Sequence, residues 1–156
     1  MRQKTLMLLL PLLLVTAGPL QAAPLAETLV GTWHCSAREG DSDVAMTLSY
    51  RRSDDFLVGE IIEDNGAALL DVWLDDGADE LVLRRVISYD ATVEMAVVEV
   101  APGRVKLEGE MRHVLGTTSK VREDIRFTGR EEFRAIWEAD SGDGWELILE
   151  RTCKRV

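Results

Sequence analysis

The sequence contains few cysteine, histidine, proline and aromatic residues. Its 156 residues include only two cysteines, two histidines and four prolines, and aromatic residues make up 6%. Two cysteines exclude a disulfide-dense miniprotein, and a hydrophobic content of 46% excludes a disordered or collagen-like chain. A chain of this length corresponds to one domain and is long enough to bury a core.

The chain is acidic overall. The 18 lysines and arginines are outnumbered by 28 aspartates and glutamates, which gives a net charge of −10. A nucleic-acid-binding protein neutralises phosphates with a basic surface, so this charge excludes that class. We therefore expect no nucleic-acid partner.

The amino-terminal segment has the order of a secretory signal peptide. Arg2 and Lys4 form a basic start, an apolar run follows from Leu6 to Val15, and small residues come next around Ala22. The run is half of the roughly 20 residues that a membrane-spanning helix needs, so we expect no permanent membrane anchor. No cysteine follows the run closely, so a lipid-anchored lipoprotein is not expected.

We expect cleavage after Ala22, with a signal peptide over residues 1–22 and a single domain over residues 23–156. Removing 22 residues, two of them basic, leaves 134 residues with a net charge of −12. The expected location is the periplasm or the secreted space.

Export changes the interpretation of the two cysteines. In an oxidising compartment an even pair indicates a disulfide, and these two lie near the start and the end of the mature chain, at Cys35 and Cys153. The C-x-x-C spacing typical of a redox-active pair is absent. We therefore predict a structural disulfide between them.

Turn-forming residues recur about every 11 to 14 residues along the mature chain, as in the clusters Asp64 to Gly66 and Pro102 to Gly103. Nine such turns divide it into ten candidate strands. No stretch sustains the i, i+3, i+4 periodicity of a helix.

Between the turns, apolar and polar residues alternate with the period of a strand that has one buried face. The residues predicted to point inward include Met46, Leu48, Tyr50, Val105, Leu107, Met111, His113, Val121, Glu123, Ile125, Phe127, Trp145, Leu147 and Leu149. A long sheet with one apolar face must pack on a second sheet or close on itself, and short connections favour closure. The prediction is an all-β protein with a single antiparallel up-and-down β-barrel of eight to ten strands.

Closure makes a specific prediction about the two terminal strands. With an even number of strands, the first and the last lie side by side and antiparallel. If Cys35 faces Cys153 in register, then Trp33 faces Arg155, and Arg151 lies diagonal to the disulfide on its other side. An arginine packed over Trp33 at the barrel mouth would form a cation–π contact.

The residues Gly31, Thr32 and Trp33, with a basic residue on the last strand able to cover the tryptophan, resemble the G-x-W signature of the calycin superfamily, the lipocalins and their shorter relatives. The opening from Leu29 to Trp33 is also similar to small bacterial lipocalin-like and nitrobindin-like barrels. The resemblance implies structural roles for Gly31, Trp33, Arg151 and Arg155. His34 to Ser36 replace the further glycines of the nitrobindin type, so haem is not expected to follow from it.

Catalytic machinery is missing from the sequence. It has no G-x-S-x-G, H-E-x-x-H, P-loop or glycine-rich dinucleotide motif, and two histidines are too few for most metal sites or catalytic triads. We expect no enzyme, no metal and no cofactor.

The barrel interior contains the candidate binding residues. Arg84 and Arg85 are adjacent on a strand, so they point to opposite faces and one of them faces inward. Glu60, Glu99 or Glu123 are its possible partners, and a paired arginine in a lined cavity would suit an anionic ligand head. A salt bridge at the edge of the barrel is the alternative. Bulky residues that parity cannot all place inside are Tyr50, Trp73, Tyr89, Met95, Met111, Phe127, Phe133 and Trp137. The predicted ligand-lining set is Tyr50, Arg85, Met111, His113 and Phe127. The pattern leaves open whether the interior is hollow or filled.

These observations predict an exported, non-enzymatic protein that binds a small hydrophobic or amphipathic ligand. Two alternatives stay open. The acidic surface would suit a basic protein partner, as in an inhibitor of a basic secreted enzyme such as lysozyme. A filled barrel without a ligand would suit a structural protein of the cell envelope.

Overall fold

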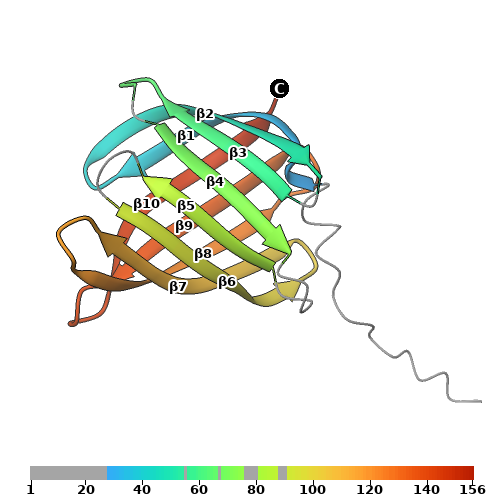
Figure 1. The fold of residues 1–156 in the computed structure, drawn as a ribbon. Coiled ribbons are helices and arrows are strands. Elements are labelled where there is room, and N and C mark those ends of the chain that lie inside the picture. The colour runs from blue at the N-terminus through green and yellow to red at the C-terminus, as the bar shows by residue number, and fades with distance from the viewer. Residues whose placement is uncertain (1–27, 55, 67, 76–80, 88–90) are drawn as a thin grey trace, which may run out of the picture.

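The computed structural model describes residues 28–54, 56–66, 68–75, 81–87 and 91–156 (Figure 1). The expected signal peptide, residues 1–22, lies outside them. The described chain forms ten strands: β1 (Gly31–Glu39), β2 (Ser42–Ser53), β3 (Phe56–Glu63), β4 (Ala68–Asp75), β5 (Leu81–Ile87), β6 (Ala91–Ala101), β7 (Arg104–His113), β8 (Thr118–Phe127), β9 (Glu132–Asp140) and β10 (Trp145–Arg155).

The ten strands form one closed antiparallel barrel. Each strand pairs with the next in the sequence, and β10 returns to pair with β1. The prediction of an all-β, up-and-down barrel is confirmed, with ten strands at the upper end of the predicted range. Among the residues that the structure describes, no helix is long and apolar enough to cross a membrane.

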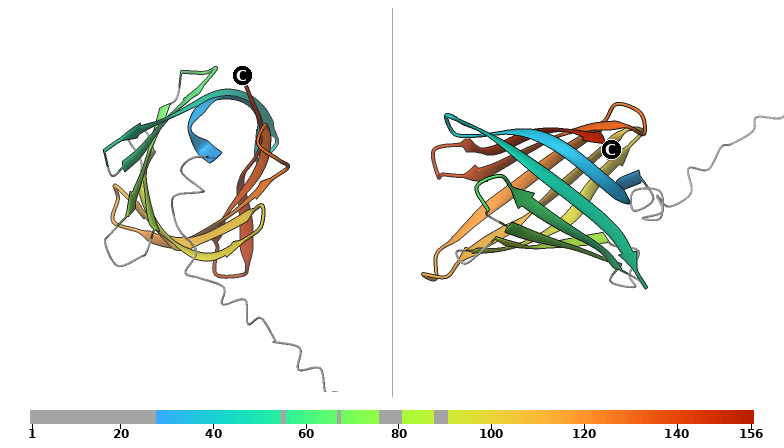
Figure 2. Two further views of the ribbon diagram at one scale, coloured as in Figure 1. Left: turned by 90° about the vertical axis from the view of Figure 1, so that its right-hand side faces the viewer. Right: turned by 90° about the horizontal axis from the view of Figure 1, so that it is seen from above.

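The two ends of the barrel differ. At the end where β1 begins, residues 28–29 are helical and lie within the ring of strands in the end-on view (Figure 2, left). Leu29 is 1% exposed there. We call this the closed end. At the opposite end β1, β3, β5, β7 and β9 finish and β2, β4, β6, β8 and β10 begin.

The hydrophobic core lines the interior of the barrel along most of its length. Trp33 and Leu83 are fully buried and Phe133 is 1% exposed. Toward the opposite end, Met111 and Leu149 are 9% and 8% exposed. The predicted inward face of β2 is confirmed, because Met46, Leu48 and Tyr50 are all buried.

Two β-bulges reverse the predicted alternation. In β10 the register shifts between Leu147 and Leu149, so Trp145 and Leu147, predicted to point inward, are 40% and 42% exposed. In β6 the register shifts between Val97 and Glu99, and Glu99 lies on the outer face. An inserted residue moves every residue beyond it to the other face of the strand, which explains both errors.

Candidate functional site in the barrel interior

The seam between β1 and β10 closes the barrel through a disulfide. Cys35 and Cys153 are register partners, as predicted, and are bonded to each other across 118 residues of sequence. The described chain has no free cysteine. A disulfide is compatible with the expected location outside the cytoplasm.

Arg155 and Trp33 seal the closed end. They are register partners, and the Arg155 guanidinium carbon lies 4.2 Å from the centre of the Trp33 ring, which confirms the predicted cation–π contact. Arg155 also donates to the carbonyls of Val30 at 2.6 Å and Thr28 at 2.7 Å. Trp33 Nε1 donates to the Leu29 carbonyl at 2.8 Å. The two side chains therefore tie the incoming segment to the last strand.

Gly31 makes this arrangement possible. Its φ of +131° is a conformation that other residues rarely adopt, and a Cβ at this position would overlap the guanidinium of Arg155. The G-x-W pattern thus has a physical basis here. The glycine leaves room for the arginine that covers the tryptophan.

A chain of buried polar side chains crosses the middle of the barrel. We call it the ionic chain; its members are Tyr50, Asp71, Arg85, Glu123 and Arg151, all at most 4% exposed. The contacts, in order, are Tyr50 Oη to Asp71 Oδ2 at 2.9 Å, Arg85 Nε to Asp71 Oδ1 at 2.7 Å, Arg85 Nη2 to Asp71 Oδ2 at 3.0 Å, Arg85 Nη2 to Glu123 Oε2 at 3.2 Å and Arg151 Nη2 to Glu123 Oε1 at 2.9 Å.

The ionic chain spans the interior from wall to wall. In a ring of ten strands, β5 lies five strands away from β10 in either direction, so Arg85 and Arg151 stand on opposite walls. Figure 1 shows β9 and β10 behind β4 and β5. Glu123 on β8 links the two arginines. At this level polar side chains therefore cross the interior of the barrel.

The first half of the ionic chain follows one line of register partners. Tyr50 faces Gly59, Gly59 faces Asp71, and Asp71 faces Arg85 across β2, β3, β4 and β5. The ring of Tyr50 occupies the space over Gly59, where a Cβ would overlap it. Gly59 therefore lets Tyr50 reach across β3 to Asp71.

Replacing Gly59 with alanine should lower the free energy of unfolding by about 2–4 kcal/mol, because the methyl group displaces the Tyr50 ring and breaks its hydrogen bond to Asp71. Urea denaturation of the wild type and the variant measures the loss. The same change in a Tyr50→Ala background should cost much less, since the ring is then absent. Equal costs in the two backgrounds would contradict this explanation.

Electrostatics keep Asp71 and Arg85 charged at neutral pH. Burial by itself raises the pKa of Asp71, but the adjacent Arg85 guanidinium outweighs this and the pKa of Asp71 lies below its usual value. Burial also opposes the charge on Arg85, yet Asp71 and Glu123 raise its pKa. Burial and the neighbouring Asp71 carboxylate raise the pKa of Tyr50, so its hydroxyl stays protonated and donates.

Stability should fall in acid. The pKa of Asp71 is lower in the folded state, so its stabilising contribution is complete above about pH 4 and disappears as the pH falls through its folded pKa. Asp124, whose pKa is lowered to about 2 mainly by its hydrogen bond with Arg104, acts in the same direction. Urea midpoints should be level from about pH 7 to pH 5 and drop between about pH 4 and pH 2. A midpoint at pH 3 equal to that at pH 7 would contradict the pairing.

Four buried polar atoms in the described part of the barrel have no hydrogen-bond partner: Trp73 Nε1, Trp137 Nε1, Arg151 Nε and Glu123 Oε2. Glu123 Oε2 lies 3.2 Å from Arg85 Nη2, without the alignment of a hydrogen bond. Trp137 is the register partner of Glu123, and the Arg85 guanidinium lies over its ring at 5.1 Å. Three of the four atoms therefore belong to residues connected with the ionic chain. Such buried atoms are normally satisfied by a bound group or by water.

The structure places the predicted ligand-lining residues in three different parts of the barrel. Tyr50 and Arg85 meet in the ionic chain. Met111 is buried toward the opposite end, His113 is half-buried at the end of β7, and Phe127 packs against Phe133 toward the closed end. None of these three joins the ionic chain in the described hydrogen bonds and ion pairs.

One of the three predicted partners of Arg85 is confirmed. Glu123 is a partner, whereas Glu60 and Glu99 lie on the outer face and are wrong. The main partner, Asp71, was missed, although it shares its face of β4 with the buried Trp73. Trp137 and Trp73 are both interior, which parity had left open. Tyr89, from the same bulky set, lies outside the described residues.

The way Arg85 is paired disfavours the predicted anionic ligand head. Asp71 and Glu123 already neutralise Arg85 and Arg151, so the buried charges sum to zero. Bringing an anion into this site would bury an uncompensated charge, which is costly.

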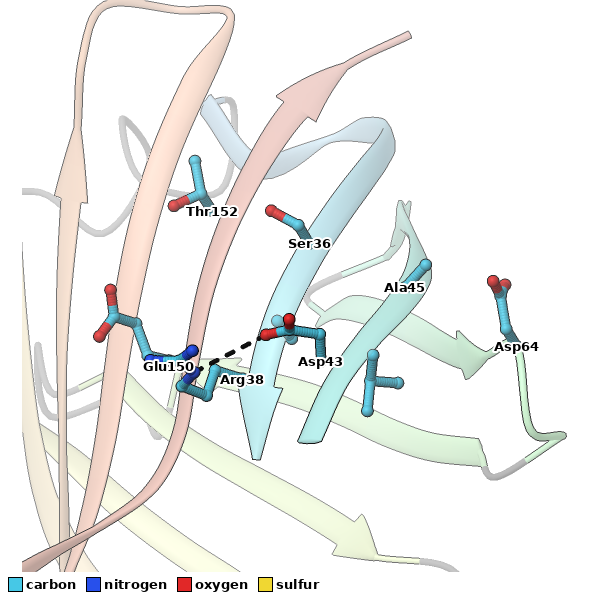
Figure 3. A pocket seen from close by; sticks show the side chains of 9 residues that line it. Ser36, Arg38, Asp43, Ala45, Asp64, Glu150 and Thr152 are labelled. Carbon is cyan, nitrogen blue, oxygen red and sulfur yellow. Dashed lines mark ion pairs between the residues drawn. The ribbon is translucent and has the colours of Figure 1, made fainter. Parts of the chain in front are cut away.

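A groove on the outer surface is a weaker candidate. It is open and lies over β1, β2 and β10 (Figure 3). Its side chains include the exposed pair Arg38 and Asp43 at 3.7 Å, with Asp64 and Glu150 nearby. It lacks buried, unpartnered polar atoms among the residues described, so we regard the interior as the candidate site. No group of three or more metal-ligating side chains occurs in the described part of the chain.

No protein-family model matches the sequence, and no curated protein is significantly similar to it. Solved structures are similar to the chain to different degrees. Rv2717c from M. tuberculosis matches with a TM-score of 0.67 and 12% identity over 85% of this chain and 96% of that one. A de novo designed fluorescence-activating β-barrel has a TM-score of 0.40 and 12% identity over 84% and 96% of the two chains. The likeness to Rv2717c supports the barrel fold.

Proposed function

We propose that the protein is an exported, non-enzymatic binding protein of the calycin type that holds a small neutral molecule inside its barrel. The observation that supports this function is the set of four unpartnered polar atoms in the interior. Natural interiors rarely leave buried donors unpaired, and such atoms are frequent where a ligand or water supplies the missing partner. The expected signal peptide over residues 1–22 and the disulfide support export.

The four atoms indicate the chemistry of the ligand. Trp73 Nε1, Trp137 Nε1 and Arg151 Nε are donors, whereas Glu123 Oε2 is an acceptor. A hydroxyl group can donate one hydrogen bond and accept two, and it adds no charge to an interior whose charges already balance. The surrounding core is apolar. We therefore expect an amphipathic molecule with a neutral hydroxyl-type polar group rather than a carboxylate.

The test is a fluorescence titration of the purified mature protein with dodecanol and with dodecanoate, combined with native mass spectrometry for copurifying molecules. Dodecanol should bind more tightly than dodecanoate. Trp137→Phe should weaken dodecanol binding by about 2–10-fold, the value of one hydrogen bond. Trp145→Phe is the matched control, because Trp145 lies on the outer face under Arg122 and should leave binding unchanged.

Two outcomes would overturn the proposal. If neither probe binds and no molecule copurifies, water satisfies the four atoms and the barrel is a filled structural protein. If dodecanoate binds more tightly than dodecanol, the site prefers an anionic ligand. The balance of buried charges then does not determine which ligand binds.

A second candidate function, binding of a basic secreted protein such as lysozyme, is favoured by the distribution of surface charge. Outer-face arginines are largely neutralised by carboxylates, as in the pairs Arg122–Glu138 at 2.7 Å and Arg134–Glu150 at 2.7 Å. The net charge of −10 is therefore carried by acidic groups free to attract a basic partner. Lysozyme should be captured at low salt and released as the salt rises; failure to capture it at low salt would overturn this candidate.

A further inference from the structure

The outer face of β3, β4 and β5 carries a patch of apolar side chains. We call it the apolar wall; it consists of Phe56, Val58, Ile62, Leu70, Val72 and Val86. Phe56, Ile62, Leu70 and Val86 are 43–47% exposed, and Val58 and Val72 are half-buried between them. Leu70 is the register partner of Val86, and Val58 of Val72, so the patch is continuous over three strands. Figure 1 shows that β3, β4 and β5 are neighbours.

The outer face of β7, β8 and β9 is the opposite case. It carries alternating charges that pair with each other and with neighbouring strands: Arg104–Asp124 at 2.7 Å, Arg126–Asp124 at 2.9 Å and Arg122–Glu138 at 2.7 Å. The outer face of β7, β8 and β9 is therefore suited to contact with water. A contiguous apolar patch on the same barrel is the typical sign of an interaction surface.

Two charged residues stand on the apolar wall, on opposite sides of its centre. The centre lies on β4, between Leu70 and Val72. Glu60 on β3 is the register partner of Leu70, and Arg84 on β5 is the register partner of Val72. Glu60 has no ion pair among the described contacts, and Arg84 pairs with Glu94 at 2.9 Å while both side chains remain more than half exposed.

We propose that the apolar wall is the interface between two copies of this chain. A two-fold axis that lies in the contact plane, perpendicular to the line from Glu60 to Arg84, places Glu60 of each copy against Arg84 of the other. The centre of the wall then packs on itself, as an isologous interface requires. Two opposite charges at mirrored positions on an otherwise apolar patch make the wall complementary to itself.

The charge distribution favours this occupant over others. The wall carries one acidic and one basic residue among its described side chains, so it offers no net field to a strongly charged protein partner. The net charge of −10 opposes docking on an anionic membrane. Docking of a second copy requires neither a net field on the wall nor attraction to an anionic membrane. Burial of the apolar side chains at the centre provides the attraction.

Sedimentation velocity of the purified mature protein from about 1 µM to about 500 µM tests the proposal, a range that covers weak and moderate dimers. The wild type should shift from monomer to dimer within it. Leu70→Glu should remain monomeric throughout, because the charge would be buried at the centre of the contact. Glu108→Arg, on the outer face of β7, is the control and should dimerise like the wild type.

A charge exchange separates this interface from any other self-association. Glu60→Arg and Arg84→Glu should each weaken dimerisation by about 5–10-fold or more, and the double variant should regain most of it because the pairs are restored in reverse. A wild type that stays monomeric at the highest concentration overturns the proposal, as does a dimer that survives Leu70→Glu. Binding of a monomeric wild type to uncharged phosphatidylcholine vesicles, lost in Leu70→Glu, would also overturn it and assign the wall to a lipid surface.

Discussion

Replacing Arg85 with methionine should lower the free energy of unfolding by about 3–5 kcal/mol, the cost of breaking a buried ion pair by removing one partner. Methionine keeps a long apolar stem but removes both hydrogen bonds to Asp71 and the ion pair with Glu123. Asp71, which is fully buried, then has the Tyr50 hydroxyl as its remaining donor and must stay charged at high cost or take up a proton. Urea denaturation followed by tryptophan fluorescence measures the loss.

Arg84→Met is the matched control on the same strand. Arg84 points outward and pairs with Glu94, but the two side chains are 60% and 64% exposed, so the substitution should change stability by only about 0.5 kcal/mol. Adding Asp71→Asn to Arg85→Met should recover part of the loss, because it removes the uncompensated charge. If Arg85→Met were no more damaging than Arg84→Met, the ionic chain would not form as described.

The interior of the first and last strands was predictable because two constraints act on it together. Alternation fixes which residues point inward, and closure of an even-stranded barrel fixes that β1 and β10 are antiparallel neighbours. One pair, Cys35 with Cys153, then sets the register of the whole seam. The contact of Trp33 with Arg155 follows from that register, and the structure confirms it.

Prediction failed where alternation itself is interrupted or hidden. A bulge moved Glu99 to the outer face, and no feature of the sequence marks that inserted residue. The outer face of β3 is as apolar as its inner face, so the sequence does not show which of its residues point inward. For this reason Glu60 was wrongly predicted as an interior partner of Arg85. The same property that hid the parity of β3 is the one that makes the apolar wall.

The sequence predicted which members of the ionic chain point inward only in part, and it did not predict the contacts that they make across the barrel. That one of Arg84 and Arg85 must face inward follows from their adjacency, and Glu123 was recognised from its parity. The link from Arg85 through Glu123 to Arg151 joins opposite walls of the barrel, and such contacts depend on shear and diameter rather than on strand order. The unpartnered atoms of Trp73 and Trp137 depend on the same three-dimensional packing.

Removing the disulfide should have a comparably large effect. The double variant Cys35→Ala/Cys153→Ala should lose about 4–5 kcal/mol of unfolding free energy, because the bond closes a loop of 118 residues and restricts the unfolded chain. The loss arises mainly in the unfolded state, so the folded barrel should keep its β1–β10 pairing and its circular dichroism spectrum. The measurement is urea denaturation of the oxidised wild type and the double variant.

The unfolded-state origin of this effect gives it a second signature. An unfolded chain without the cross-link is more expanded and exposes more surface, so the double variant should show a steeper dependence of unfolding free energy on urea, a higher m-value, as well as a lower midpoint. Reduction of the wild type with dithiothreitol should produce the same two changes, which separates loss of the bond from the effect of the alanine side chains in the core. If reduction left the midpoint unchanged, the bond would not form in solution. If it lowered the midpoint at a constant m-value, the stabilisation would lie in the folded barrel instead, at the seam where β1 meets β10.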